Sequence, residues 1–251
     1  MISICIPTYE KPDYLKRLLD SIAIQTYKDY EIIISDDSKS ELIKNVFDDY
    51  TKVFKNGLFY YYHNDSKSNN PVLNWNNAIK KAKGEYIKMM FDDDWFAYNY
   101  SLQCLATEIE NTESDLVFCG TWQVSINKKY SRNITKDQFS LLTKDYRNLL
   151  YGNYIGAPSA VIFRNNNYFF DENLIWYVDF ELYMRIIKKT MEFTSINYPL
   201  ISIGINEKQV TNYVSNNKDL IRKEKKYIYL KHGVGILWKV KKYIYCKIKN
   251  N

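Results

Sequence analysis

The sequence has few of the residues that build metal–thiolate sites, disulfide frameworks and membrane spans. Four cysteines, Cys5, Cys104, Cys119 and Cys246, are scattered along the chain without a C-x-x-C pair, and only two histidines occur. This pattern argues against a zinc site and against disulfide bonding. No run of about 18 apolar residues is present, and the first residues lack the basic flank and cleavage site of a secretory signal. We therefore expect a cytoplasmic protein that does not span a membrane.

Glycine and proline are also scarce, at 8 and 5 of 251 residues, which argues against a repeat or fibrous architecture. The balance of 46% hydrophobic and 25% charged residues is typical of a soluble globular protein and not of a disordered one. A chain of this length accommodates one large α/β domain with a tail.

Positive charge is concentrated toward the C-terminus. The formal net charge is +6, but the segment Lys218–Lys249 contains eleven basic residues against only Asp219 and Glu224, so the rest of the chain is net negative. A broad basic face is therefore not expected, and no nucleic-acid partner is predicted. The basic segment indicates instead a local attachment patch for an anionic partner.

The first 120 residues alternate between strand-like and helix-like patterns. The apolar run Ile2–Ile6 predicts a strand, and apolar residues at helical spacing after Pro12 predict a helix. Tyr30–Ser35 is a continuous apolar run, as in a strand buried on both faces of a parallel sheet. Such alternation predicts an α/β fold with a Rossmann-like, mostly parallel sheet flanked by helices. Further helices are predicted at about 41–50 and 72–83, and further strands at 58–62, 85–91 and 116–120.

The second half of the chain is less regular. Its patterns predict a loop and then a strand over 153–164, a helix over 179–189 and a short strand over 199–205. No linker rich in proline, glycine or serine separates the two halves. We therefore assign residues 1–215 to one domain and residues 216–251 to a basic, amphipathic helical tail.

The residues that follow each predicted strand are the first candidates for function, because ligands of parallel α/β sheets bind beyond the carboxyl ends of the strands. No G-x-G-x-x-G or G-x-x-x-x-G-K-[ST] sequence follows the first strand, which argues against dinucleotide-binding and P-loop proteins. Aspartates follow two other strands, as Asp36-Asp37 and as Asp92–Asp94. Clustered carboxylates repel one another unless a cation is present, and their oxygens suit Mg²⁺ or Mn²⁺. We predict a divalent metal site that would neutralise a diphosphate, in preference to a solvated acidic turn.

Four segments, taken in order, resemble the family 2 glycosyltransferases of the GT-A fold. They are SICIPTYEKPDYLKRLLDSIAIQTYKDYEIIISDDS (Ser3–Ser38), LNWNNAIKKAKGEYIKMMFDDDW (Leu73–Trp95), GAPSAVIFR (Gly156–Arg164) and VDFELYMRI (Val178–Ile186). The resemblance implies a nucleotide-sugar donor and an inverting transfer of one sugar to an acceptor hydroxyl. It implies a nucleotide-binding half at 1–120, an acceptor-binding half at 121–215, and a role in bacterial surface polysaccharide synthesis (capsule, lipooligosaccharide or O-antigen).

The resemblance also implies roles for individual residues around the donor. Tyr9 would stack on the base, and Asp37 would accept the imide N–H of uracil, although thymine presents the same group. Asp94 would contact Mn²⁺ or Mg²⁺ directly, with Asp92 as a second metal candidate and Asp93 nearer the ribose. The full set of nucleotide-binding residues implied is Pro7, Thr8, Tyr9, Glu10, Asp36, Asp37, Asn76 and Asp93.

Asp179 matches the general base of the resembled family. In a single in-line displacement the acceptor oxygen attacks opposite the leaving nucleoside diphosphate, so the base must lie on the acceptor side. Glu181 is the competitor for this role, and an N-cap of the predicted helix is the structural alternative for Asp179. A histidine common in the family is absent from the Glu207–Asn212 region, where Lys208 offers positive charge instead.

The tail allows two interpretations. Leu237, Val240, Ile244 and Ile248 fall on one helical face with lysines opposite, which predicts either an interfacial helix or a packed terminal helix. We expect peripheral attachment to an anionic membrane on its inner face, consistent with a glycan or lipid-linked acceptor. Two other functions were weighed. A nucleotidyltransferase lacks support because its Gly-rich basic loop is absent, and a non-catalytic GT-A-like binding subunit remains the alternative.

Overall fold

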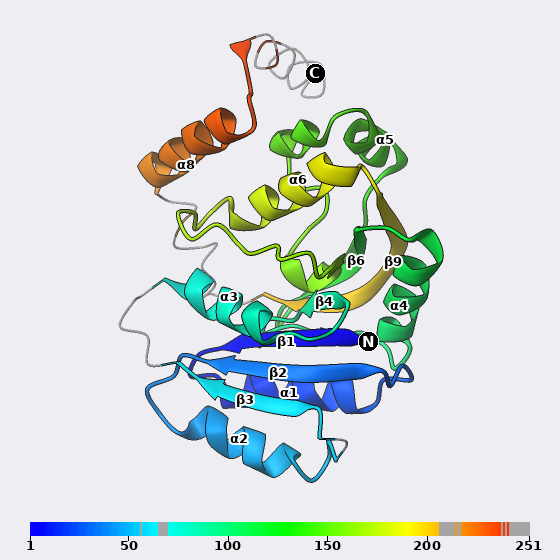
Figure 1. Cartoon of the computed structure of the whole chain (residues 1–251), viewed down its shortest axis with the longest axis vertical. Helices are drawn as coiled ribbons and strands as arrows, with labels where there is room; N and C mark the ends of the chain where they lie inside the picture. Colours follow the sequence, from blue (N-terminus) through cyan, green and yellow to red (C-terminus); the bar gives the residue numbers. More distant parts are fainter. Residues whose placement is uncertain are drawn as a thin grey trace.

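The chain, in a computed structural model, folds around one mixed sheet of nine strands with helices on both faces (Figure 1). The structure describes residues 1–55, 57–64, 70–205, 214, 217–236, 238 and 240. The strands are β1 (Ile2–Thr8), β2 (Tyr30–Asp36), β3 (Phe59–His63), β4 (Tyr86–Met89), β5 (Trp95–Phe96), β6 (Leu116–Val124), β7 (Lys129–Arg132), β8 (Val161–Arg164) and β9 (Phe193–Gly204).

Helices connect most of the strands. The α-helices are α1 (Pro12–Ala23), α2 (Leu42–Tyr50), α3 (Pro71–Lys81), α4 (Ser101–Thr112), α5 (Lys136–Lys144), α6 (Val178–Thr190) and α8 (Lys218–Lys231). Two short 3-10 helices are η1 (Tyr146–Tyr151) and η2 (Pro158–Ala160). None of the helices within the described ranges has the length and apolar character that a membrane crossing requires.

The sheet is mostly parallel, as predicted. Its strands follow the order β3-β2-β1-β4-β8-β6-β9-β5, and β7 pairs with β6. The first four strands of this order are parallel, β8 is antiparallel to both β4 and β6, and β6 is again parallel to β9. A strand from the second half of the chain therefore separates two parallel groups. The two halves of the domain share one sheet.

Helix starts are fixed by local sequence. Pro12 occupies the first turn of α1, where its missing N–H leaves no hydrogen bond unmade. Asn70 caps α3, because its side chain accepts a hydrogen bond from the N–H of Val72. Thr135 and Gln138 form a reciprocal capping box at the start of α5.

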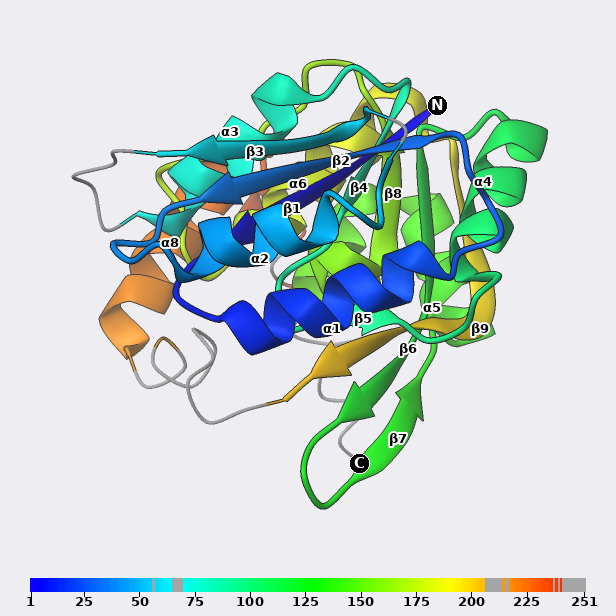
Figure 2. The ribbon, with the colours of Figure 1, turned by 90° about the horizontal axis from the view of Figure 1, so that it is seen from below.

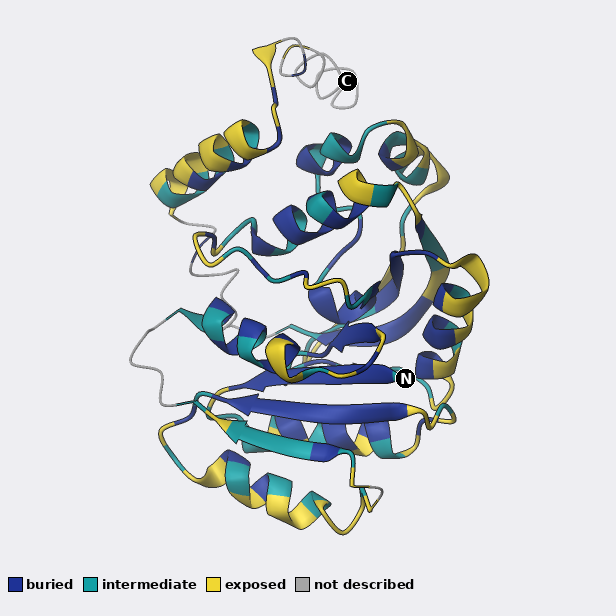
Figure 3. Ribbon diagram, in the orientation of Figure 1, coloured by how far each residue is buried: buried dark blue, intermediate teal, exposed yellow. Residues whose placement is uncertain are grey.

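The core has two layers, one on each face of the sheet. Helices α1, α2 and α4 pack on one face, and α3 and α6 pack on the other. Figure 2 shows α1 and α2 side by side against the sheet. All residues of β1 and β2 are buried, as Figure 3 shows, which explains why the strands are mostly apolar and why two polar residues within them, Ser3 and Glu31, hydrogen-bond to each other. This burial fixes both strands, and hence the loops at their carboxyl ends.

Some predicted boundaries were wrong. The strand expected at 199–205 is the second half of the longer strand β9, and α4, α5 and β7 were not predicted. The helix expected to reach residue 83 ends at Lys81, because the backbone is extended at Ala82, and Gly84 then lies against the β1 backbone. A Cβ at Gly84 would stand 2.7 Å from the nitrogen of Ser3. The Glu207–Asn212 region, Leu237, Ile244 and Ile248 lie outside the described residues.

Candidate active site

The loop after β1 is tied to the loop after β2 by Glu10. Its backbone N–H donates to the hydroxyl of Ser38 (2.8 Å), and its carboxylate accepts from the N–H groups of Lys39 (2.8 Å) and Ser40 (3.0 Å). Glu10 has a φ of 52°, in the left-handed region that a side chain adopts only at a cost of about 1–2 kcal/mol. These hydrogen bonds offset that cost and hold the two loops together. Glu10 is thus engaged in building the site.

The two aspartates after β2 differ in what they contact. Asp36 is fully buried, and its carboxylate accepts from the N–H of Ser38 (2.9 Å) and the hydroxyl of Tyr61 (2.7 Å). Asp37 is only partly buried, and its Oδ1 is buried without a hydrogen-bond partner in the described part of the protein. Burial, together with the charge of Asp36, raises the pKa of Asp37. Asp37, not Asp36, has an oxygen available for a ligand.

The aspartates after β4 lie beside the end of β1, as predicted. The hydroxyl of Thr8 donates to Asp92 (3.1 Å), the N–H of Tyr9 approaches the same oxygen (3.4 Å), and the ammonium of Lys11 pairs with the other (3.3 Å). Both oxygens of Asp92 are therefore occupied. Tyr9 itself, by contrast, is 49% exposed. Pro7 lies within β1, opposite Ser35 of β2.

Asp94 is held from the far side by β9 and the loop before β8. Its Oδ1 accepts from the N–H of Gly204 (3.1 Å), and it also hydrogen-bonds to the hydroxyl of Ser159. Burial, and after it the charge of Asp93, raise the pKa of Asp94 to about 8. Lys88, a buried lysine of β4, lies nearby and partly opposes this effect. The contacts of Ser159 and Lys88 with Asp94 were not predicted from the sequence.

The carbonyl of Asp93 is enclosed by Arg17 and Gly204. The guanidinium of Arg17 donates to that oxygen (2.6 Å) and stacks over Trp95, 3.9 Å from the ring centre. A Cβ at Gly204 would lie only 2.3 Å from the same carbonyl. Glycine is therefore required for β9 to pack against the aspartate loop. A single glycine at a strand end was the only sequence signal of this contact.

The aspartate loop suits a divalent cation that also binds a phosphate ligand. No group of three or more His, Cys, Asp or Glu side chains within the described ranges is arranged to hold a metal by itself. Mg²⁺ in particular is usually bound by one or two carboxylates, with substrate phosphates and water completing the shell. Asp94 fits this role, whereas the carboxylate of Asp92 is already paired with Lys11. The donor set is thus compatible with the predicted metal, with Asp94 as its main ligand.

Asp179 is connected to the aspartate loop through the segment Asn153–Ser159. Its Oδ2 accepts from the side-chain amide of Asn153 (2.8 Å), which also donates to the carbonyl of Gly156 (3.0 Å). The hydroxyl of Ser159, at the other end of the segment, accepts from the N–H of Phe91, just before the aspartates (3.0 Å). One short loop therefore contacts both acidic groups.

The environment of Asp179 gives it the basicity of a proton acceptor. Desolvation of its carboxylate raises its pKa to about 7, against opposing hydrogen bonds from the N–H of Phe180 and the amide of Asn153. Asp179 lies in the first turn of α6 and is not its N-cap, which is Tyr177. Glu181, the competing acid, is fully buried and paired with Arg185 (2.7 Å) and Lys231 (2.9 Å).

Asn76 does not join the acidic cluster. Its side-chain amide donates to the carbonyl of Phe170 (3.0 Å) and to the carboxylate of Glu172 (3.0 Å), and its oxygen accepts from the N–H of Phe170 (2.8 Å). We therefore assign it no contact with a ligand. Asn74, two residues earlier, does reach the end of β1, where its amide donates to the carbonyl of Thr8 (3.1 Å). Trp75 packs between the rings of Phe91 and Phe170.

Replacing Gly204 by alanine should displace the aspartate loop. The added Cβ meets the backbone carbonyl of Asp93, which cannot move as a flexible side chain would. We expect a loss of about 1–3 kcal/mol in the free energy of unfolding, measured by urea denaturation. Gly235→Ala is the matched control, because a Cβ there meets nothing within 4 Å. Equal stability of the two variants would contradict the close packing of β9 on this loop.

Comparisons with known proteins agree on one family. The family model described as glycosyl transferase family 2 matches residues 3–169. An uncharacterized glycosyltransferase of Bacillus subtilis, YwdF, is 29% identical over 94% of this chain and 85% of its own length. A GalNAc(5)-diNAcBac-PP-undecaprenol beta-1,3-glucosyltransferase of Campylobacter jejuni is 33% identical over 37% of this chain and 29% of its own. Residues 1–349 of S. aureus TarS, solved with UDP-GlcNAc, align with a TM-score of 0.66 at 22% identity. That alignment covers 83% of this chain and 59% of the TarS chain, and it shows the same fold.

Proposed function

This chain belongs to glycosyl transferase family 2, and we propose that it inverts configuration as it transfers a sugar from a UDP-sugar to an acceptor hydroxyl. The acceptor we propose is a glycan or lipid-linked glycan of bacterial surface polysaccharide synthesis. The name of the Campylobacter relative, an undecaprenol-linked glycan glucosyltransferase, supports this choice. The observation that carries the proposal is the placement of two acidic groups, Asp94 and Asp179, at opposite ends of the segment Asn153–Ser159.

The donor half of the proposal rests on the loops after β1 and β2. The buried Oδ1 of Asp37 lacks a partner in the described residues, and an imide N–H of a pyrimidine base would supply one. The exposed ring of Tyr9 offers a flat face on which such a base can stack. Uracil and thymine both present the imide, whereas guanine would place a different pattern of donors against Asp37. Asp36 and Glu10 would then hold the loops in position.

The acceptor half rests on Asp179. A carboxylate with a pKa of about 7 is about half ionised at pH 7, and its ionised form is basic enough to take the proton of an attacking hydroxyl. Asn153 and the N–H of Phe180 orient that carboxylate. A bound Mg²⁺ or Mn²⁺ at Asp94 would supply neutralisation of the charge that develops on the leaving diphosphate. Lys11 and Arg17 line the same loop and add fixed positive charge there.

Calorimetric titration with UDP, dTDP and GDP, each with Mn²⁺ and then with chelator, tests the donor site. We expect UDP and dTDP to bind tightly with Mn²⁺ and GDP to bind weakly. Binding of UDP should weaken when the chelator removes the metal. Failure of every nucleotide to bind in either condition would reject the proposed donor site and favour a non-catalytic carbohydrate-binding protein. A screen of UDP-sugars for hydrolysis or transfer would follow a positive result.

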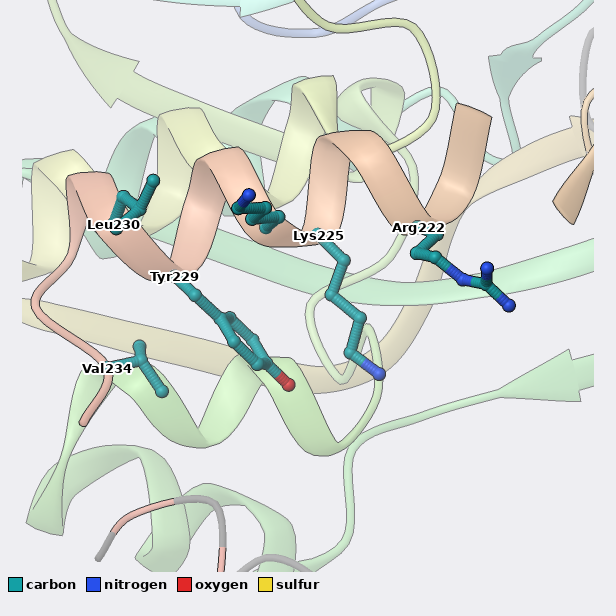
Figure 4. Close-up of a pocket in the computed structure, with 6 residues that line it drawn as sticks. Arg222, Lys225, Tyr229, Leu230 and Val234 are labelled. Atoms are coloured by element: carbon teal, nitrogen blue, oxygen red, sulfur yellow. The ribbon is translucent and has the colours of Figure 1, made fainter. Parts of the chain in front are cut away.

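We also propose that the protein attaches to an anionic membrane surface, and the described support lies on α8. Arg222, Lys225 and Tyr229 project from one side of this helix beside Val234, around a pocket of about 310 Å³ that Lys226 and Leu230 also line (Figure 4). Within the part of the chain that the structure describes, Arg222, Lys225 and Lys226 form no ion pair with an acidic side chain. Leu230 is 75% exposed and Ile236, in the following segment, is 78% exposed. Cations beside exposed apolar side chains suit lipid phosphates and the headgroup layer.

Reversing two charges on α8 tests this attachment. Each basic residue near an anionic leaflet contributes about 1 kcal/mol, so Lys225→Glu with Lys226→Glu should weaken binding to phosphatidylglycerol vesicles at least about 30-fold. Lys52→Glu with Lys55→Glu changes the net charge equally at the far end of the molecule, beyond α2, and should have little effect (Figure 1). Equal weakening by both pairs in a sedimentation assay would mean that net charge alone, and not this surface, governs binding.

A further inference from the structure

One buried carboxylate of α8 holds the segment that leads into α6. Glu224 is 3% exposed, and its Oε1 accepts a hydrogen bond from the backbone N–H of Ile175 (2.9 Å). Its Oε2 accepts from the N–H groups of Trp176 (2.9 Å) and Tyr177 (3.1 Å). The three donors are consecutive residues, and α6 begins directly after them at Val178. A single side chain therefore satisfies three neighbouring backbone donors.

The residue at the N-cap position of α6 does not cap the helix with its side chain. The first N–H groups of any helix lack partners inside the helix, and a Ser, Thr, Asp or Asn usually supplies one. Here the N-cap residue is Tyr177, whose side chain makes no capping hydrogen bond. Within the helix, the carboxylate of Asp179 accepts from the N–H of Phe180 (2.8 Å). Glu224 acts one step earlier, because it holds the N-cap residue and the two residues before it, and its negative charge lies at the positive end of the α6 dipole. Leaving such a carboxylate buried is favourable only because all three bonds are made.

Other contacts hold α8 along the rest of α6. Lys231 pairs with Glu181 of α6 (2.9 Å), and the hydroxyl of Tyr227 donates to Asp171 (2.7 Å). Ile228 is fully buried in the same core cluster as α6. Loss of Glu224 alone should therefore loosen the entry to α6 without detaching α8.

We propose that Glu224 is a positioning residue for Asp179, an inference that rests on the proposed role of Asp179 as general base. Asp179 is the second residue of α6, so its carboxylate points where the first turn of the helix directs it. The groups that face it are the amide of Asn153, the charge of Arg132 and the ring of Tyr183. A proton acceptor displaced by about 1 Å from its acceptor hydroxyl loses about 100-fold in rate. Glu224 fixes that placement from 45 residues further along the chain.

The test compares Glu224→Gln with Asp219→Asn, which removes an exposed acid from the first turn of the same helix. Glutamine keeps one acceptor oxygen but loses the charge and the second acceptor. We expect kcat to fall about tenfold or more in Glu224→Gln, with the affinity for UDP unchanged. Amide hydrogen exchange at Ile175, Trp176 and Tyr177 should become faster. A looser start of α6 should let water reach Asp179 and so lower its pKa, because burial is what raises it. The acidic limb of the pH–kcat profile should then move to lower pH. Asp219→Asn should change none of these quantities.

The outcomes separate this inference from the function on which it rests. Faster exchange at residues 175–177 with kcat and pH profile within twofold of the parent enzyme would overturn the positioning role. Unchanged exchange would show that the three hydrogen bonds do not form and would overturn it as well. If Asp179→Asn remains active, Asp179 is not the general base. If Asp179→Asn is inactive but Glu224→Gln is fully active, only the positioning role of Glu224 is rejected. Glu224→Asp, which keeps the charge, should recover part of the lost kcat.

Discussion

Asp179→Asn should lower kcat by about 10³-fold and leave the affinity for UDP unchanged. A positioned general base typically contributes between about 10² and 10⁴ in rate. Asparagine has the same shape and can still accept from the N–H of Phe180, so the start of α6 should stay intact. The donor contacts lie at the ends of β1 and β2, away from this helix. Steady-state kinetics and calorimetry with UDP measure the two quantities separately.

The parent enzyme should show the matching pH dependence. The base acts only as a carboxylate, and desolvation raises the pKa of Asp179 to about 7. The rate should therefore reach a plateau above this pKa, be at about half its maximum near pH 7, and approach a tenfold fall per pH unit well below it, as the carboxylate becomes protonated. Asp137→Asn, at an exposed acid of α5, should keep this profile. A profile that stays flat from pH 5 to 8, or an active Asp179→Asn enzyme, would exclude Asp179 as the base.

The strands that build the site could be predicted because their sequence pattern is dictated by burial. The strands β1 and β2 lie between helices on both faces, so their residues are mostly apolar, and the polar residues that follow mark the strand ends. Parallel strands bring those ends to one edge of the sheet, and the structure does place Thr8 beside Asp92. Helices α4 and α5 were missed although the sequence carries signals for both, since Leu102, Leu105 and Ile109 of α4 recur at helical spacing and Thr135 and Gln138 form the capping box of α5.

The roles of individual side chains were harder to predict, since adjacent residues look alike in sequence. Nothing local distinguishes Asp36 from Asp37, yet Tyr61 of β3 occupies the first and leaves an oxygen of the second unpaired. Asn76 was placed with the nucleotide because the resemblance implies that its helix faces the donor, but the segment at Phe170 engages its amide instead. In each case the deciding partner comes from a distant part of the chain.

The same limit applies to the tail. The charge count set residues 216–251 apart as a basic attachment segment, and it grouped Glu224 with Asp219 as minor exceptions. The fold buries Glu224 and leaves Asp219 exposed. One face of α8 is therefore bound to α6, while another presents the cations of the proposed membrane surface. Composition alone could identify only the second of these faces.

Asp94→Asn should abolish the metal dependence of donor binding and lower kcat by about 10²–10³-fold. Neutralisation of the leaving diphosphate is worth several kcal/mol when a cation is held in place, and Asp94 is the carboxylate we assign to that cation. Asp92→Asn is the matched control within the same triplet, because the carboxylate of Asp92 is already paired with Lys11 and Thr8. Titration of UDP into each variant with Mn²⁺ and with chelator measures the difference. If Asp92→Asn loses the metal response and Asp94→Asn keeps it, the assignment is reversed.

The stability of Asp94→Asn distinguishes loss of a ligand from loss of the fold. Asp94 is only 2% exposed and lies beside Asp93, and burial raises its pKa to about 8, so its charged form is unfavourable in the folded protein without a cation. Asparagine removes that charge and can still accept from the N–H of Gly204. The thermal midpoint of the metal-free variant should therefore equal or exceed that of the metal-free parent. An inactive enzyme that is at least as stable as its parent would mean that the sequence keeps an unfavourable buried acid at this position for the cation and not for the fold.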